Sequence, residues 1–149
     1  MHSDPQFPDC APGKTVRLRG WLSFYEGQDI KQELARIGED HAARYLRSRG
    51  YRVLERNFRA RSGEVDIIAE HKGALVFVEV KARSSDEFGE PRDAVTIWKQ
   101  RRIVNAARSY AARLGGGERN IRFDIVEVFV TPEGRVKKVE LIPSAFEGS

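Results

Sequence analysis

The sequence has one cysteine and no long hydrophobic run, and each of these shortages excludes a class of protein. Cys10 has no partner for a disulfide within the chain, which is typical of a reducing compartment. Acidic residues and prolines occupy the N-terminal segment, where a secretory signal would need an apolar run. No stretch is long enough to span a bilayer, so we expect a cytoplasmic protein without a membrane partner.

The remaining composition is that of a globular domain. The chain has 149 residues, of which 40% are hydrophobic and 32% are charged. A chain of this length buries enough surface to fold without disulfides. The formal net charge of +4 favours a polyanionic partner, but net charge describes the surface field and does not define the fold.

The hydrophobic pattern predicts the order helix, three strands, helix, two strands. Apolar residues recur at helical spacing from Asp29 to about Gly50, and a second helix is expected from Asp93, as its cap, with Ile97 and Leu114 on its apolar face. The predicted strands are residues 51–58, 64–70, 75–83, 121–130 and 135–142. Strand three, helix two and strand four would form a right-handed crossover in a mixed sheet, which is an α/β fold.

The same pattern divides the chain into three parts. Residues 1–28 are expected to be an N-terminal extension, either docked on the domain or disordered. Residues 29–142 form the predicted domain, and residues 143–149 are a C-terminal tail.

Two predicted strands combine an apolar composition with charged residues. "EVDII" contains Asp66, and "LVFVEVKAR" places Glu79 and Lys81 two residues apart, on one face of a strand. If Lys72 and Gly73 form the hairpin turn, Asp66 lies opposite Glu79. Buried like charges need a counter-charge, a proton or a cation. Mg²⁺ suits this pair, because it is commonly held by one or two carboxylates together with water and phosphate.

The groups next to these acids extend the prediction. Lys81 would position an attacking water and offset developing negative charge, and the backbone carbonyl of Val80 is a candidate further metal ligand. The alternative is an ordinary acid–lysine ion pair at a hairpin end near solvent.

The ordered set of motifs resembles a known family. Asp66 followed by "EVK" resembles the D-x(n)-E-x-K core of the PD-(D/E)XK nuclease superfamily. With "GEDHAARYLRSRGYRVLERNF", "FGEP", "AVTIWKQRR" and "RFDIVEV", residues 30–142 are similar to the YraN family of predicted bacterial endonucleases and to archaeal Holliday junction resolvases. The resemblance implies a restriction-endonuclease-like mixed β-sheet flanked by helices, in the order α-β-β-β-α-β-β. It also implies phosphodiester hydrolysis that depends on Mg²⁺ or Mn²⁺.

The resemblance assigns roles by position in the motifs. Asp66 and Glu79 resemble the metal ligands, and Lys81 resembles the catalytic lysine. Glu39, in "GED", resembles an additional acid at the metal, whereas its helical position alone is equally compatible with a glutamate in solvent. Gln100 resembles a glutamine that some of these nucleases place near the site, but a hydrogen-bonded core glutamine is the favoured interpretation.

Basic residues predict where nucleic acid binds. Arg56, Arg59 and Arg61 precede the strand of the first acid and are candidates for binding backbone phosphates. Lys99 on the second helix is expected to be solvated. His71, at the predicted turn, is expected on the surface, and Asp124 is expected to have a structural role.

Two functions follow from the sequence. The leading hypothesis is a nuclease acting on DNA, and on branched or structured DNA in particular, with RNA as a second nucleic acid to consider. No sequence-reading DNA-binding motif is found in the sequence. The alternative is a non-catalytic module that binds nucleic acid or protein on the same fold. A homodimer would suit symmetric cleavage of two strands, but nothing in the sequence establishes one.

Overall fold

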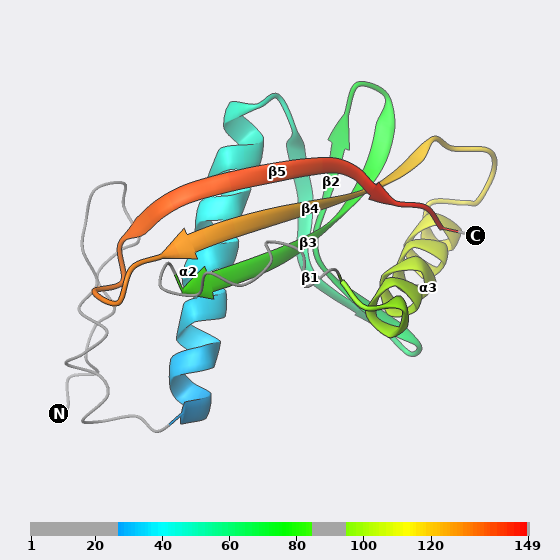
Figure 1. Cartoon of the computed structure of the whole chain (residues 1–149). Helices are drawn as coiled ribbons and strands as arrows, with labels where there is room; N and C mark the ends of the chain where they lie inside the picture. Colours follow the sequence, from blue (N-terminus) through cyan, green and yellow to red (C-terminus); the bar gives the residue numbers. More distant parts are fainter. Residues whose placement is uncertain (1–26, 85–94, 149) are drawn as a thin grey trace, which may run out of the picture.

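The fold is a mixed five-stranded sheet with two helices, seen in a computed structural model that describes residues 27–84 and 95–148 (Figure 1). The elements are α2 (Gly27–Ser48), β1 (Arg52–Ala60), β2 (Gly63–His71), β3 (Ala74–Ser84), α3 (Ile97–Arg113), β4 (Ile121–Val130) and β5 (Val136–Phe146). The strand order is β1-β2-β3-β4-β5; β3 and β4 are parallel, and the other neighbours are antiparallel. The α/β class and the predicted order of elements are confirmed.

The two helices cover opposite faces of the sheet (Figure 1). Successive residues of β3 point to opposite faces, so Phe77 packs with α3 residues such as Ile103, whereas Val78 packs with α2 residues such as Leu46. Each helix therefore buries one apolar face against the central strands. Neither α2 nor α3 is long and apolar enough to cross a membrane.

The β2–β3 hairpin has the register that the sequence predicts. His71 pairs with Ala74, and the pairing continues to Ile67 and Val78. Lys72 and Gly73 both have positive φ, at 49° and 79°, as a type I′ turn requires at its two central positions. Lysine is uncommon there, so the pairing of the two apolar strands outweighs the local preference of this residue.

Several element ends differ from the prediction. Thr96 caps α3, because its side-chain oxygen accepts a hydrogen bond from the Lys99 backbone N–H at 3.1 Å. Asp93, the predicted cap, lies outside the described residues, as do residues 1–26 of the predicted extension. β5 continues to Phe146, past the predicted end of the domain at residue 142.

The predicted apolar face of α3 is partly wrong. Ile97 is 62% exposed and Leu114 is also exposed. The buried face is made by Ile103, Ala106, Ala107 and Tyr110. The buried face of α3 is therefore rotated about the helix axis by about one residue from the predicted face. The first turn of the helix lies beyond its apolar contact with the sheet.

Asp124 in β4 is fully buried at the centre of a hydrogen-bond network. Tyr51 Oη donates to one carboxylate oxygen at 2.8 Å, Arg122 donates to both oxygens at 2.9 Å, and the Ser144 backbone N–H donates at 3.0 Å. The structural role predicted for Asp124 is confirmed. His71, which was expected on the surface, lies at the turn with its ring half-buried and stacked on Tyr51, with ring centroids 3.9 Å apart.

Asp124→Asn is expected to lower the free energy of unfolding by about 2 kcal/mol. The amide oxygen still accepts hydrogen bonds, but the Arg122 guanidinium loses its counter-charge. Urea unfolding measures the loss. Glu70→Gln is the control, because Glu70 is exposed in its ion pair with Arg52 and should change stability by less than about 0.5 kcal/mol. Equal losses in the two variants would contradict this account of the network.

Candidate active site

The acids meet where β2 and β3 separate. Regular pairing of the two strands ends at Ile67 and Val78, and the Val80 backbone N–H then donates to the Asp66 carboxylate at 2.8 Å. The carboxyl groups of Asp66 and Glu79 share a hydrogen bond. Beyond this point β3 runs toward α2, while the β1–β2 turn lies toward α3 (Figure 1). Asp66 and Glu79 therefore lie next to each other at the point where the two strands separate.

Glu79 is electrostatically unfavourable as a carboxylate. Its side chain is 7% exposed, and its Oε1 atom is buried without a hydrogen-bond partner. Burial and the charge of Asp66 raise the pKa of Glu79 to about 8, although Lys99 and Lys81 oppose the rise. At neutral pH Glu79 in the metal-free protein therefore holds a proton, and a cation bound beside it would displace that proton.

This donor set fits a hard divalent cation. Two carboxylates are present, one with an unpartnered buried oxygen, and Val80 adds a backbone carbonyl beside them. No group of three or more His, Cys, Asp or Glu side chains is arranged to hold a metal within residues 27–84 and 95–148. A cation here would keep open positions for water or phosphate, which is the usual habit of Mg²⁺.

Glu39 faces the acids from α2. A Cβ placed on the neighbouring Gly38 would lie 3.0 Å from the Ala82 Cβ, so this helix packs closely on the end of β3. Burial and the charge of Asp66 raise the pKa of Glu39, while a hydrogen bond from Asn57 lowers it. Glu39 is thus oriented toward the site, as the resemblance implies, and does not extend into bulk solvent.

Asn57 is a site residue that the sequence analysis missed. It has a φ of 53° inside β1, and the register on either side places it across from Asp66. Asparagine tolerates this left-handed backbone better than other side chains do, and such strain often occurs at functional sites. An asparagine within the pattern "LERNF" was the available signal.

Comparison with known proteins defines the family. Residues 38–128 match the model of the Uncharacterised protein family UPF0102. The chain belongs to this family. It is 47% identical over 117 residues to the UPF0102 protein of Symbiobacterium thermophilum, covering 78% of this chain and 98% of that protein. The corresponding protein of Caldanaerobacter subterraneus subsp. tengcongensis is 44% identical over 117 residues, covering 78% and 96%.

The region matched by the UPF0102 model contains the whole acid site. It begins at Gly38, next to Glu39, and ends at Val128, so it includes Asp66 and Glu79. The family description states no activity, so the function must be argued from the geometry of the site.

Lys99 is the second site residue that the sequence pattern did not indicate, and the prediction that it is solvated is wrong. Its side chain is 27% exposed, and Nζ lies 3.6 Å from Glu64 Oε1 and 3.9 Å from Glu79 Oε2. A Cβ on Gly63 would lie only 2.0 Å from the Arg102 carbonyl oxygen. Because Gly63 lacks a side chain, α3 packs directly on the start of β2 and brings Lys99 to the acids.

Gln100, next to Lys99, has a structural contact. Its Nε2 donates to the Val95 carbonyl at 2.9 Å, so the amide connects the first turn of α3 to the segment before it. This geometry matches the hydrogen-bonded glutamine favoured from the sequence. A catalytic role for Gln100 stays a prediction.

Lys81 lies in β3, close enough to Glu79 to lower the pKa of that acid. In the parallel register it is paired with Glu127 of β4, which is buried and accepts a hydrogen bond from Arg83 Nε at 2.6 Å. The sequence analysis did not single out Glu127.

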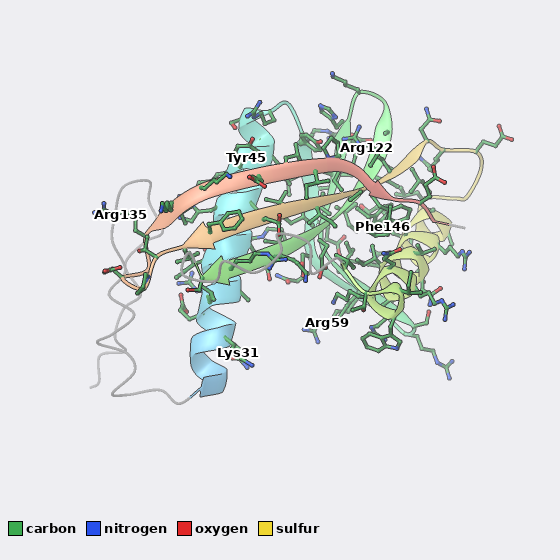
Figure 2. The ribbon with its side chains drawn as sticks, viewed as in Figure 1. Lys31, Tyr45, Arg59, Arg122, Arg135 and Phe146 are labelled. Carbon is green, nitrogen blue, oxygen red and sulfur yellow. The ribbon has the colours of Figure 1, made fainter. Side chains whose placement is uncertain are left out.

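The three arginines predicted to bind phosphate differ in their surroundings. Arg56 lies 2.7 Å from Asp40 and 3.9 Å from Glu39, so its guanidinium is directed to acids of α2. Arg59 and Arg61 are exposed near the β1–β2 turn, and Figure 2 shows Arg59 below the strands, between the two helices in that view. These two remain the candidates for phosphate contacts.

Proposed function

We propose that this UPF0102 protein is a metal-dependent nuclease that hydrolyses phosphodiester bonds in DNA, with branched or otherwise structured DNA as its substrate. The observation that carries the proposal is the Asp66–Glu79 pair, two carboxyl groups brought together where the strands separate, one with a buried unpartnered oxygen. The PD-(D/E)XK-like order of Asp66, Glu79 and Lys81 supports the same chemistry.

The residues have distinct tasks in this proposal. Asp66, Glu79 and the Val80 carbonyl would hold Mg²⁺ or Mn²⁺. When bound, the cation would supply Lewis-acid polarisation of the scissile phosphate. Lys81 orients the attacking water and offsets charge on the phosphate oxygens. Because its pKa is raised, the Glu39 carboxylate accepts a proton from that water more readily than an ordinary glutamate does.

Lys99→Met is expected to lower kcat/KM for cleavage by about 10²-fold, since it removes a positive charge beside the acids and the phosphate. Methionine keeps most of the apolar length of the side chain, so the packing of α3 should survive. Lys72→Met is the matched control, because Lys72 lies in the exposed turn at the other end of the hairpin. Steady-state cleavage of a labelled substrate measures both variants, and a similar loss in each would contradict a local role for Lys99.

Crystals soaked in Mn²⁺ test the metal site. The proposal predicts an anomalous difference peak between the carboxylates of Asp66 and Glu79 in the wild type. Asp66→Asn should lose this peak while keeping the hydrogen bond from Val80, because the amide oxygen also accepts. A wild-type crystal without a peak would count strongly against the proposal.

A binding module without turnover is the second candidate. It is favoured because, within the described parts of the chain, neither Glu39 nor any other acid, histidine or cysteine is close enough to share one metal ion with the pair. It predicts DNA binding that needs no metal and survives Asp66→Asn. Parallel binding and cleavage assays separate the two candidates, because the nuclease hypothesis predicts cleavage that this variant loses.

A further inference from the structure

Trp98, in the first turn of α3, is exposed without any role in the fold. Its side chain is 67% exposed, the largest value among the large hydrophobic residues that the structure describes. It lies outside the buried face of α3, which begins five residues further on, at Ile103. Its neighbour Ile97 is 62% exposed, so two large apolar side chains reach water at the start of α3, and this suggests a binding partner.

Trp98 is connected to the acid site through its neighbours. The Arg102 guanidinium lies over the indole ring, 5.2 Å from its centroid, and also lies 3.7 Å from Glu64 Oε1. Lys99, the next residue in the chain, lies between Glu64 and Glu79. The ring is therefore one residue away from a side chain that contacts the acid pair.

The charge around the ring indicates the class of partner. Arg101 is exposed and Arg102 is half-buried on the same helix, and the Arg102 Nε atom is buried without a hydrogen-bond partner. Arg59 of β1 is also exposed. It is paired across the sheet with Glu64 of β2, which is the residue that Arg102 contacts. An exposed aromatic ring with one arginine over it, on a surface that carries further arginines, is an arrangement that binds nucleotides, with the base stacked on the ring and its phosphates near the cations.

We propose that Trp98 stacks on an unpaired nucleobase next to the phosphate held at the acid site, so that the substrate must present single-stranded nucleotides there. The inference deepens the proposed nuclease function and rests on it. A second copy of the chain is a less suitable partner, because a two-fold contact through this patch would oppose one cluster of arginines with another. A fully paired duplex does not offer the face of a base, whereas a flap, a junction arm or a frayed end does.

Fluorescence and binding measurements on the full chain test this inference. The chain has two tryptophans, so Trp21→Phe leaves Trp98 as the single reporter. Short oligothymidylate and a blunt duplex of equal length are titrated with Ca²⁺ in place of Mg²⁺, which suppresses cleavage. We expect oligothymidylate to quench the Trp98 fluorescence and the duplex to leave it unchanged.

Variants are compared by the fluorescence anisotropy of the labelled nucleic acid, because the Trp98 variants lack the tryptophan reporter, and the comparison separates stacking from charge. Trp98→Ala should weaken oligothymidylate binding about 10-fold and duplex binding less than about twofold, while Trp98→Phe should retain most of the affinity. Ile97→Ala is the matched control, because it removes the adjacent exposed apolar side chain and should leave both affinities unchanged.

Three results would overturn the inference. These are equal losses for both nucleic acids, a loss in Ile97→Ala as large as that in Trp98→Ala, and a change of oligomeric state in Trp98→Ala, seen by sedimentation, with binding unaltered. Failure of the nuclease proposal can be distinguished from failure of the stacking inference. If no substrate is cleaved but Trp98→Ala still loses single-strand binding selectively, the stacking site stands and the proposed catalysis does not.

Discussion

Glu79→Gln is expected to reduce phosphodiester cleavage by at least about 10²-fold and, at the same time, to stabilise the metal-free protein at alkaline pH. The neutral amide cannot contribute the charge that holds a divalent cation. Its NH₂ group can instead donate to Asp66, in place of the proton that Glu79 holds below about pH 8. Function and stability should therefore change in opposite directions.

The stability effect depends on pH in a defined direction. Burial and the charge of Asp66 raise the pKa of Glu79 from 4.5 to about 8 in the folded chain. Between these values the folded state keeps a proton that the unfolded state releases, so this stabilisation is complete below about pH 4.5 and is lost as pH rises through about 8. Glutamine does not titrate. The variant should thus match the wild type near about pH 5 and exceed it by about 3 kcal/mol near about pH 9.

Urea unfolding in EDTA across this pH range measures the difference between the two proteins. Adding Mg²⁺ at alkaline pH should stabilise the wild type and leave Glu79→Gln unchanged, since only the wild type has both carboxylates. Glu70→Gln, at the exposed far end of β2, is the control and should show no pH-dependent difference. A variant less stable than wild type near about pH 9 would contradict the assigned state of the pair.

Gly63→Ala is expected to destabilise the protein by about 3 kcal/mol or more and to remove cleavage activity. The new Cβ would lie 2.0 Å from the Arg102 carbonyl oxygen and 2.7 Å from the Ala106 backbone nitrogen. Backbone atoms cannot rotate away, so α3 would have to move. Lys99 would then lose its position beside Glu79.

Gly38→Ala provides the graded comparison. Its Cβ would meet the Ala82 Cβ at 3.0 Å, a side-chain contact that a small shift of α2 relieves. Alanine is also a better helix former than glycine by about 1 kcal/mol, so the two effects nearly cancel. Thermal unfolding of both variants should therefore show a large loss for Gly63→Ala and a small one for Gly38→Ala. Similar melting temperatures would contradict close packing of α3 on β2.

The sequence predicted the parts of the site that local pattern determines. The apolar runs on either side of Lys72 and Gly73 pair best in one register, because a shift by one residue would turn the buried side chains of both strands toward the opposite faces. That register is what brings Asp66 near Glu79. The order of helices and strands along the chain followed from the periodicity of apolar and polar residues.

Residues that depend on helix orientation could not be predicted in the same way. Lys99 and Gln100 are adjacent, and a rotation of α3 by about one residue decides which of them faces the acids. That rotation is set by the contact at Gly63, a long-range packing effect with no periodic signal in the sequence. The backbone of Asn57 likewise depends on its neighbours across the sheet.

The most direct test of the account is cleavage of a panel of DNA substrates by the wild type and Lys81→Ala with Mg²⁺ or Mn²⁺. The panel contains a four-way junction, a flap and a linear duplex. We predict metal-dependent cleavage of the branched substrates by the wild type, and a rate at least about 10²-fold lower for Lys81→Ala. Equal cleavage by the two proteins, or none by the wild type with either metal, would contradict the proposed function.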